Sequence, residues 1–339
     1  PHPVIVGYLG PHLHEYLFNL GSVSKTSGSL PIENYLSSTV LNVPHSVVSQ
    51  DRNKMISELA RAIRQKKVDY PLTRYFLSRD QVELLSRNAP QTEFKVVEYI
   101  SKLPPNERHV NYKFDGQEHV FEFTDKDFER IDIISNYFTE YARIKCNVIN
   151  QQPPIVAWRN KSQEVAEAAV AYSMKRSTDL NMKALSEGIF GARLKVCTTF
   201  KISVAIKIYE VFGASFIFDP FGGWGDRGIA AAMSPNVQRY IATDANGDLT
   251  KGYSEIVDFF RERKQLEYHH TAIEDFDLAK HLGPPGSPMN PDFIFSSPPF
   301  FTYEIYGTEG TQSTVRHSTE ADWVAWLVQV TTRLLSHLK

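Results

Sequence analysis

The segment FIFSSPPF, residues 293–300, ends an apolar run with two serines, two prolines and an aromatic ring. The prolines hold such a loop rigid and remove backbone N–H donors. An aromatic face at the end of a strand offers a surface on which a flat ring can stack. On its own, the SPPF tetrapeptide (residues 297–300) is as compatible with a proline turn after a strand as with a ligand-binding loop.

A second segment, FIFDPFGGWGDRGIAAA (residues 216–232), carries a glycine-rich turn between a predicted strand and a predicted helix. Glycines let the backbone bend sharply and let a ligand approach closely. The spacing is not GxGxxG and no GK[ST] follows, which argues against a dinucleotide or phosphate site. The turn therefore predicts a cofactor with few phosphates that lies over the loop, with an unliganded turn as the alternative.

Acidic residues follow the next two predicted strands. In RYIATDANGDL the second strand ends on Asp244, where an acid can hydrogen-bond ribose hydroxyls. In TAIEDFD (residues 271–277) the third strand is expected to end with Glu274, Asp275 and Asp277, one of which could accept from an adenine amino group. An ordinary turn aspartate and a solvated acidic loop are the respective alternatives.

The pattern around these motifs predicts an α/β fold. Short apolar strands alternate with helices after about residue 160, which indicates a parallel sheet with ligands at the carboxyl ends of its strands. The strands are expected at 215–219, 239–244, 268–275 and 292–297. Helices are expected at 51–67, 124–146, 162–176, 201–213, 228–233 and 249–265, a hairpin at 109–123 and a linker at 150–158.

The glycine turn, the acid after the second strand and the SPPF tetrapeptide, in this order, resemble the S-adenosylmethionine-dependent amino-methyltransferases of DNA and RNA. The resemblance covers about residues 195–339. The strings DPFGGWGDR and SSPPFFTYEIYGTEGTQS are similar to a phage and large-virus branch of DNA methylases. There the tetrapeptide is followed by an acid, an aromatic residue and a Gln-Ser pair, which Glu304, Tyr306 and Gln312-Ser313 match.

The resemblance implies a Rossmann-like class I methyltransferase sheet with helices on both faces, S-adenosylmethionine as cofactor, and DNA or RNA as substrate. It requires no metal. The implied catalytic residues are Ser297, Pro298, Pro299 and Phe300. The implied cofactor-binding residues are Asp219, Pro220, Phe221, Gly223, Gly225, Asp244, Glu274, Asp275, Thr199, Phe200 and Lys201. The implied substrate-binding residues are Phe301, Tyr303, Glu304 and Tyr306.

The target base is suggested by the residues at the start of the tetrapeptide. In the families it resembles, Ser297 preceded by Ser296 is associated with cytosine N4, so cytosine N4 in DNA is the leading prediction. Adenine N6 methylation of DNA or RNA is the first alternative. A non-catalytic methyltransferase-like module that binds nucleic acid or protein is the second.

After the tetrapeptide the family sheet adds three more strands, whereas this sequence predicts one helix at about 320–338. Three explanations stay open: a fragment of a longer chain, strands supplied by residues 3–9 and the 109–123 hairpin, or a relic kept for structure or partner binding. An open sheet edge invites pairing, so a homo-oligomer or a partner chain that covers it is expected.

Residues 1–150 are expected to form an α+β module for substrate recognition or assembly, and residues 151–339 the methyltransferase domain. Basic side chains in and after the 51–67 helix form a candidate phosphate-contacting face, with a solvated helix face as the alternative. They are Arg52, Lys54, Arg61, Arg64, Lys66, Lys67, Arg74 and Arg79.

The composition is that of a globular protein, with 339 residues, 42% hydrophobic residues and a net charge of -2. Two cysteines without zinc-ligand spacing, and no membrane span, predict an intracellular, reducing compartment. That compartment is the cytoplasm or nucleus, or the host cell of a virus. His269, His270 and His281 show no metal-ligand spacing and are expected to be structural or exposed.

Overall fold

The computed structural model describes residues 32–37, 39–88, 95–97, 109–114, 117–122, 131–149, 151–307, 310 and 312–339. The first half contains η1 (Ile32–Tyr35), β1 (Asn42–Val43), α2 (His45–Val48), α3 (Arg52–Arg64), η2 (Thr73–Tyr75), α4 (Arg79–Asn88), β2 (Lys95–Val97), β3 (His109–Phe114), β4 (Gln117–Glu122), α6 (Ile134–Arg143) and β5 (Asn147–Val148). The middle contains α7 (Pro154–Asn160), α8 (Ser162–Arg176), β6 (Leu180–Asn181), α9 (Met182–Gly191), α10 (Ile202–Val211), β7 (Phe216–Asp219), α11 (Asp226–Met233) and β8 (Arg239–Asp244). The last part contains η5 (Gly247–Leu249), α12 (Thr250–Phe260), β9 (Gln265–His270), η6 (Ile273–Asp275), α13 (Leu278–Leu282), β10 (Phe293–Ile294), β11 (Glu304–Ile305), α14 (Ser313–Arg316) and α15 (Glu320–Leu335).

The predicted α/β fold is confirmed: four parallel strands form one sheet in the order β10-β7-β8-β9. The chain runs outward from β7 through β8 to β9 and then returns to the other side of β7 with β10. The strand order therefore reverses between β7 and β10. In open α/β sheets such a reversal leaves a crevice at the carboxyl ends of the strands, where ligands bind.

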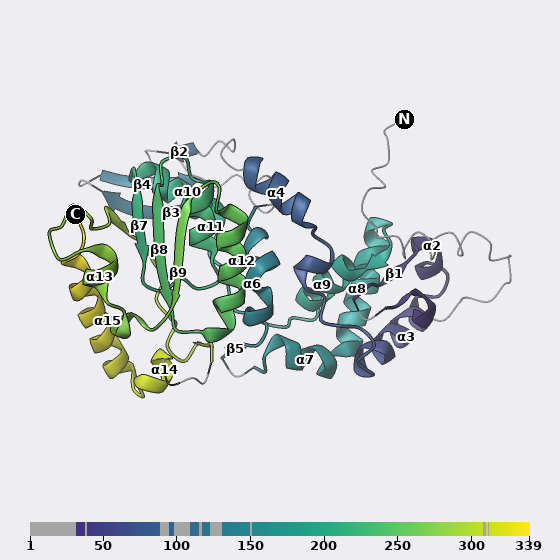
Figure 1. The fold of residues 1–339 in the computed structure, drawn as a ribbon. Helices are drawn as coiled ribbons and strands as arrows, with labels where there is room; N and C mark the ends of the chain where they lie inside the picture. Colours follow the sequence, from purple (N-terminus) through teal and green to yellow (C-terminus); the bar gives the residue numbers. More distant parts are fainter. Residues whose placement is uncertain are drawn as a thin grey trace.

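Helices cover both faces of this sheet (Figure 1). Consecutive strand residues point to opposite faces. Phe218 and the paired Ile241 pack against α13 and α15, whereas Ile217 and the paired Tyr240 pack against α10, α11 and α12. Both inner strands, β7 and β8, are thus buried on two sides, which explains why they read as continuous apolar runs in the sequence.

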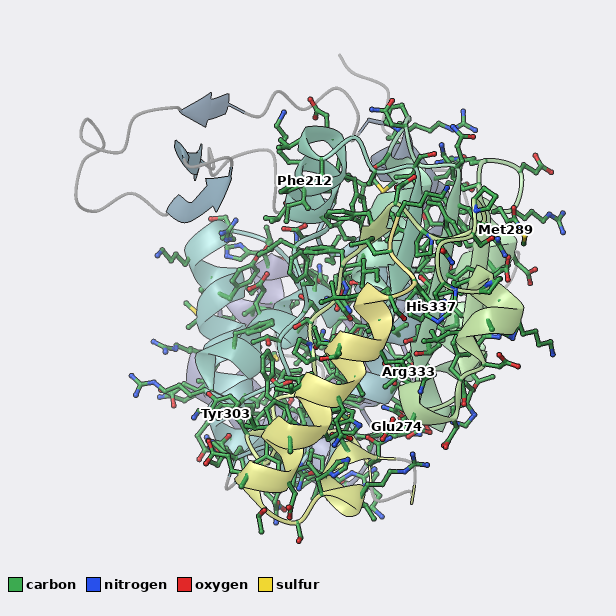
Figure 2. The ribbon with its side chains drawn as sticks, turned by 90° about the vertical axis from the view of Figure 1, so that its left-hand side faces the viewer. Phe212, Glu274, Met289, Tyr303, Arg333 and His337 are labelled. Atoms are coloured by element: carbon green, nitrogen blue, oxygen red, sulfur yellow. The ribbon has the colours of Figure 1, made fainter. Side chains whose placement is uncertain are left out.

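The helix α15 matches the helix expected at 320–338, and it lies in the foreground of Figure 2 with Tyr303 and Glu274 on opposite sides. Thr319 caps its start by accepting from the Asp322 amide. Trp326, Val330 and Leu334 recur every four residues and form the buried stripe against the sheet.

A second hydrophobic cluster lies in the helical half formed by α2, α3 and α7–α9, away from the four-stranded sheet in Figure 1. The predicted helix at 51–67 is confirmed as α3, capped by the Asp51 side chain, which accepts from the Lys54 amide. The packing does not divide at residue 150. Residues 32–72 contact residues 154–194, whereas α6 packs against α11 and α12, which cover the sheet. The domain division at residue 150 stays a prediction.

The hairpin predicted around residues 109–123 is confirmed, with the register His109↔Glu122 to Phe114↔Gln117. β2 joins it on the other side of β4. These strands form their own three-stranded sheet, and among the described strands none of them pairs with β10. The hairpin therefore does not extend the parallel sheet, and residues 3–9 lie outside the described residues.

Several predicted boundaries are wrong. The third strand is β9, which ends at His270 because its register with β8 ends there and the Thr271 amide turns back to the His269 carbonyl. The expected linker contains α7, since Pro154 suits the first position of a helix. α6 begins at Ile134, and the expected helix start at 124 lies outside the described residues.

β10 is shorter than the predicted strand at 292–297, because only Phe293 and Ile294 form ladder pairs with β7. Among the described residues, no helix combines the length and apolar character that a membrane span needs.

Candidate active site

A cavity opens at the carboxyl ends of β7, β8 and β10, where the strand order reverses. It brings together most residues that the sequence singles out. The predicted residues in its lining are Thr199, Phe200, Phe221, Gly223, Asp244, Glu274, Ser297, Pro298, Pro299, Phe300, Glu304 and Tyr306. The glycine turn, the acid after the second strand and the SPPF tetrapeptide therefore face one common space.

The glycine turn forms the floor of this cavity and is held by hydrogen bonds from several elements. The Gly222 amide donates to the Thr243 carbonyl at 2.8 Å, and the Tyr253 hydroxyl donates to the Gly223 carbonyl. Gly223 has φ +56°, in the left-handed region that favours glycine. The backbone is thus preorganised where a ligand would approach it.

Asp244 ends β8 and is tied to the glycine turn. Its Oδ2 accepts from the Gly223 amide at 2.8 Å, and its Oδ1 accepts from the Asn246 amide at 2.9 Å. Burial of this carboxyl is the main cause that raises its pKa to about 6. The carboxyl also lines the cavity, so it can accept hydrogen bonds from a ligand.

Asp219 ends β7 but does not line the cavity. Its carboxylate is fully buried and accepts from Arg227 Nε at 2.7 Å, from the Tyr240 hydroxyl at 2.6 Å and from Ser296 Oγ at 2.5 Å. The Phe221 amide donates to it as well. These contacts use both carboxylate oxygens. Asp219 therefore supports the glycine turn through buried hydrogen bonds and does not face the cavity.

Four other predicted cofactor residues also lie outside the lining: Pro220, Gly225, Lys201 and Asp275. Lys201 is exposed and pairs with Asp132 at 3.3 Å. Arg316 donates to Asp275 at 2.6 Å and lies 3.4 Å from the Glu274 carboxylate, which stays in the lining. The acids after β9 are therefore held by an arginine that the sequence analysis did not connect with them.

The two serines before the prolines differ in their contacts. Ser296 is engaged by Asp219 and accepts from the Phe221 amide at 3.1 Å. Ser297 lines the cavity, and its hydroxyl has no hydrogen-bond partner among the described residues. Ser296 therefore fixes the loop, and Ser297 is left available to a ligand.

A second hollow adjoins the tetrapeptide and contains the two predicted substrate-binding residues that the first cavity lacks, Phe301 and Tyr303. Phe300 and Glu304 line both spaces. Phe301 has φ +48°, and its ring lies 5.9 Å from that of Trp323. Left-handed backbone at a non-glycine residue stores strain that neighbouring contacts must sustain. Phe300 and Tyr303 are exposed, so this hollow is an open, aromatic-lined approach to the tetrapeptide.

Glu304 and Tyr306 hold the cavity wall together. Glu304 is buried, accepts from the Thr198 amide at 3.1 Å and accepts from the Tyr306 hydroxyl at 2.9 Å. Burial and the Glu304 charge raise the pKa of Tyr306 well above its usual range. β11 pairs antiparallel with β5, so residues 147–148 anchor this wall.

The lining also contains residues that were not predicted as site residues, among them Asp226, Trp224 and Trp326. Asp226 begins α11, accepts from the Phe200 amide at 3.3 Å and has its pKa raised to about 6 by burial. Trp224 donates from its indole to the Thr198 carbonyl at 2.9 Å. Trp326 of α15 packs against Phe221 and also lines the cavity. In the sequence, only the position of Trp224 and Asp226 in or beside the glycine turn could have indicated that they line the site.

Comparisons with family models, with curated proteins and with solved structures find no match for this chain.

Proposed function

We propose that this chain is an S-adenosylmethionine-dependent methyltransferase that acts on an exocyclic amino nitrogen of a nucleic-acid base, with cytosine N4 in DNA as the target. The observation that carries the proposal is the common cavity shared by Gly223, Asp244 and the SPPF tetrapeptide. A Rossmann-like class I methyltransferase sheet belongs to the proposal, and the strand order with its reversal beside β7 supports it.

The lining fits the chemical groups of S-adenosylmethionine. Asp244 offers carboxylate oxygens for ribose hydroxyls, and the left-handed Gly223 lets a ligand lie against the backbone. Phe221, Ile273 and Trp326 supply apolar walls for a purine ring. No basic group is needed for phosphates, in agreement with a glycine turn that lacks a phosphate-binding pattern.

When bound, S-adenosylmethionine supplies an electrophilic methyl group. The chain itself would bind and orient the base. Ser297 Oγ and the Pro298 carbonyl would accept hydrogen bonds from the two amino hydrogens, which turns the nitrogen lone pair out of conjugation with the ring. Phe300, 46% exposed at the cavity rim, would stack on a flipped-out base. Alignment of the reacting atoms would supply most of the rate enhancement.

Calorimetric titration of the full chain with S-adenosylmethionine tests the cofactor site. We expect micromolar binding that is abolished in Gly223→Asp, where a charged side chain enters the cavity, and weakened in Asp244→Ala. The absence of binding to the folded wild-type chain would overturn the proposal.

Methyl-transfer assays on cytosine- and adenine-containing DNA and RNA oligonucleotides then decide the base. Product on cytosine N4 supports the proposal, and product on adenine N6 replaces its target. Cofactor binding without product on any substrate favours a non-catalytic module.

Partners beyond the substrate also remain proposals. β10 is at one edge of the parallel sheet, and a second copy or a partner chain over that edge would satisfy its free backbone groups. Sedimentation of the purified chain with and without oligonucleotide tests both the self-association and the nucleic-acid contact. A monomer that binds no oligonucleotide would contradict both.

A further inference from the structure

Three side chains with metal-binding groups meet on the sheet face that α13 covers. Glu267 and His269 come from β9 and His281 comes from α13, and one ligand atom of each lies within 4.8 Å of the others. These residues are outside the cavity lining described above. Two imidazoles and a carboxylate are a ligand set that transition metals accept.

The fold explains why these residues meet. Glu267 and His269 are two positions apart on a strand, so both point to the same face of the sheet. α13 returns over that face and places His281 with its ring 4.6 Å from the His269 ring. Phe276 stacks on His281 at 4.6 Å and fixes the plane of its ring. The positions of the three side chains are therefore set by β9, by α13 and by the ring of Phe276.

Two of the atoms that would bind a cation, Glu267 Oε2 and His269 Nε2, are not engaged in a hydrogen bond with the described part of the protein. Glu267 Oε1 accepts from Arg239 and from Gln265, each at 3.0 Å. Its Oε2 lies 3.8 Å from His269 Nε2, which is too long for a hydrogen bond. His269 Nε2 is buried and has no hydrogen-bond partner among the described residues. A buried polar atom without a partner is a place where an ion can be expected.

A neighbouring arginine holds the carboxylate of the cluster. Arg239 orients the Glu267 carboxylate from behind, as outer partners of metal ligands do. His270, the next residue, is turned to the Ala245 carbonyl and belongs to a different contact.

We propose that Glu267, His269 and His281 form a binding site for a divalent transition-metal cation of the zinc class. Three protein ligands leave one position for water in a tetrahedral site. The cation would join β9 to α13 across the connecting segment, whose residues Ala272, Ile273 and Glu274 line the neighbouring cavity. Its role is to hold that wall in place, and it does not depend on methyl transfer.

The test uses the full chain, freed of metal with a chelator and then titrated with Zn²⁺ in competition with a chromophoric chelator. We expect one Zn²⁺ per chain. His269→Gln and His281→Gln should each lose more than the about 10–100-fold in affinity that removal of an outer partner costs. His270→Gln is the matched control and should bind Zn²⁺ as the wild type does.

Wild-type protein without stoichiometric Zn²⁺ binding, or a His269→Gln/His281→Gln double variant that binds as tightly as wild type, would overturn the proposal. Circular dichroism verifies the fold of each variant. Where a variant does not fold, Co²⁺ bound to the wild-type chain decides. Visible absorption bands of a four-coordinate site with nitrogen and oxygen ligands support the proposal, and their absence contradicts it.

Discussion

The ends of the two central strands carry one aspartate each, and the two carboxylates have different surroundings. Asp219, after β7, is enclosed by Arg227, Tyr240 and Ser296 and does not reach the cavity. Asp244, after β8, is held by two backbone amides and reaches the cavity. Two aspartates at the same edge of the sheet thus differ in accessibility: Asp219 is enclosed by protein groups, and Asp244 faces the cavity.

The difference follows from the partners that each strand end meets. The side chain of Arg227 reaches back from α11 to Asp219, and a buried ion pair of this kind leaves no oxygen for a ligand. Backbone amides fix the orientation of Asp244 without enclosing it. Stability should therefore depend more on Asp219, and cofactor binding more on Asp244.

The largest expected effect is on stability. Asp219→Ala leaves the buried Arg227 without its partner and should lower the free energy of unfolding by about 3–5 kcal/mol. Chemical denaturation measures this. The double variant Asp219→Leu/Arg227→Met removes both charges and should recover much of the loss. A single variant within about 1 kcal/mol of wild type would contradict the supporting role.

The complementary change acts on the cofactor. Asp244→Ala removes a charged hydrogen-bond acceptor and should weaken S-adenosylmethionine binding by about 10–100-fold, as expected for about 1.5–3 kcal/mol. Calorimetry measures the affinity, and denaturation should show a smaller loss of stability than in Asp219→Ala. Unchanged affinity in a folded Asp244→Ala chain would remove Asp244 from the proposed site.

Ser296 and Ser297 differ in the same way as Asp219 and Asp244, because only the second of each pair faces the cavity. Ser296→Ala leaves part of the Asp219 carboxylate without a donor and should cost about 1–3 kcal/mol of stability. Ser297→Ala removes a hydroxyl without a protein partner, so its stability should stay within about 0.5 kcal/mol while the methyl-transfer rate falls. Equal stability losses in the two variants would show that the loop uses both hydroxyls for structure.

The smallest expected effect is a pH dependence. The pKa of Asp244 is raised to about 6, so between about pH 4 and 6 the folded state binds more protons than the unfolded state. Its contribution to the free energy of unfolding should fall as the pH rises through this range and stay constant above it. Cofactor affinity should instead rise, by up to about tenfold from pH 5 to pH 7, because the ionised carboxylate is the better acceptor.

Calorimetry at several pH values checks this dependence, with Asp244→Asn as the control. The affinity of Asp244→Asn should vary less with pH. A dependence that is the same in wild type and in Asp244→Asn would assign the titration to another group. Asp226 is the first alternative, because its pKa is also raised to about 6.

Local patterns determined much of the fold without tertiary information. Asp51 before an amphipathic run predicted α3, and alternation around residues 115–116 predicted the paired β3 and β4. The glycine turn predicted the end of β7, and Asp244 the end of β8. These signals depend on residues close in sequence, where caps, periodicity and turn residues act directly.

Only the tertiary structure decided which carboxylates are free and which distant groups meet. The sequence marked Asp219 and Asp244 alike, and the position of Arg227 and Tyr240 around Asp219 separated them. β9 ended earlier than its apolar and acidic pattern suggested, because pairing with β8 stopped at His270.

The cluster of Glu267, His269 and His281 had no ligand spacing in the sequence, since its third member arrives from α13 after a turn of the chain. The burial of a side chain and its partners depend on how distant elements pack together. Patterns of neighbouring residues in the sequence do not reveal that packing.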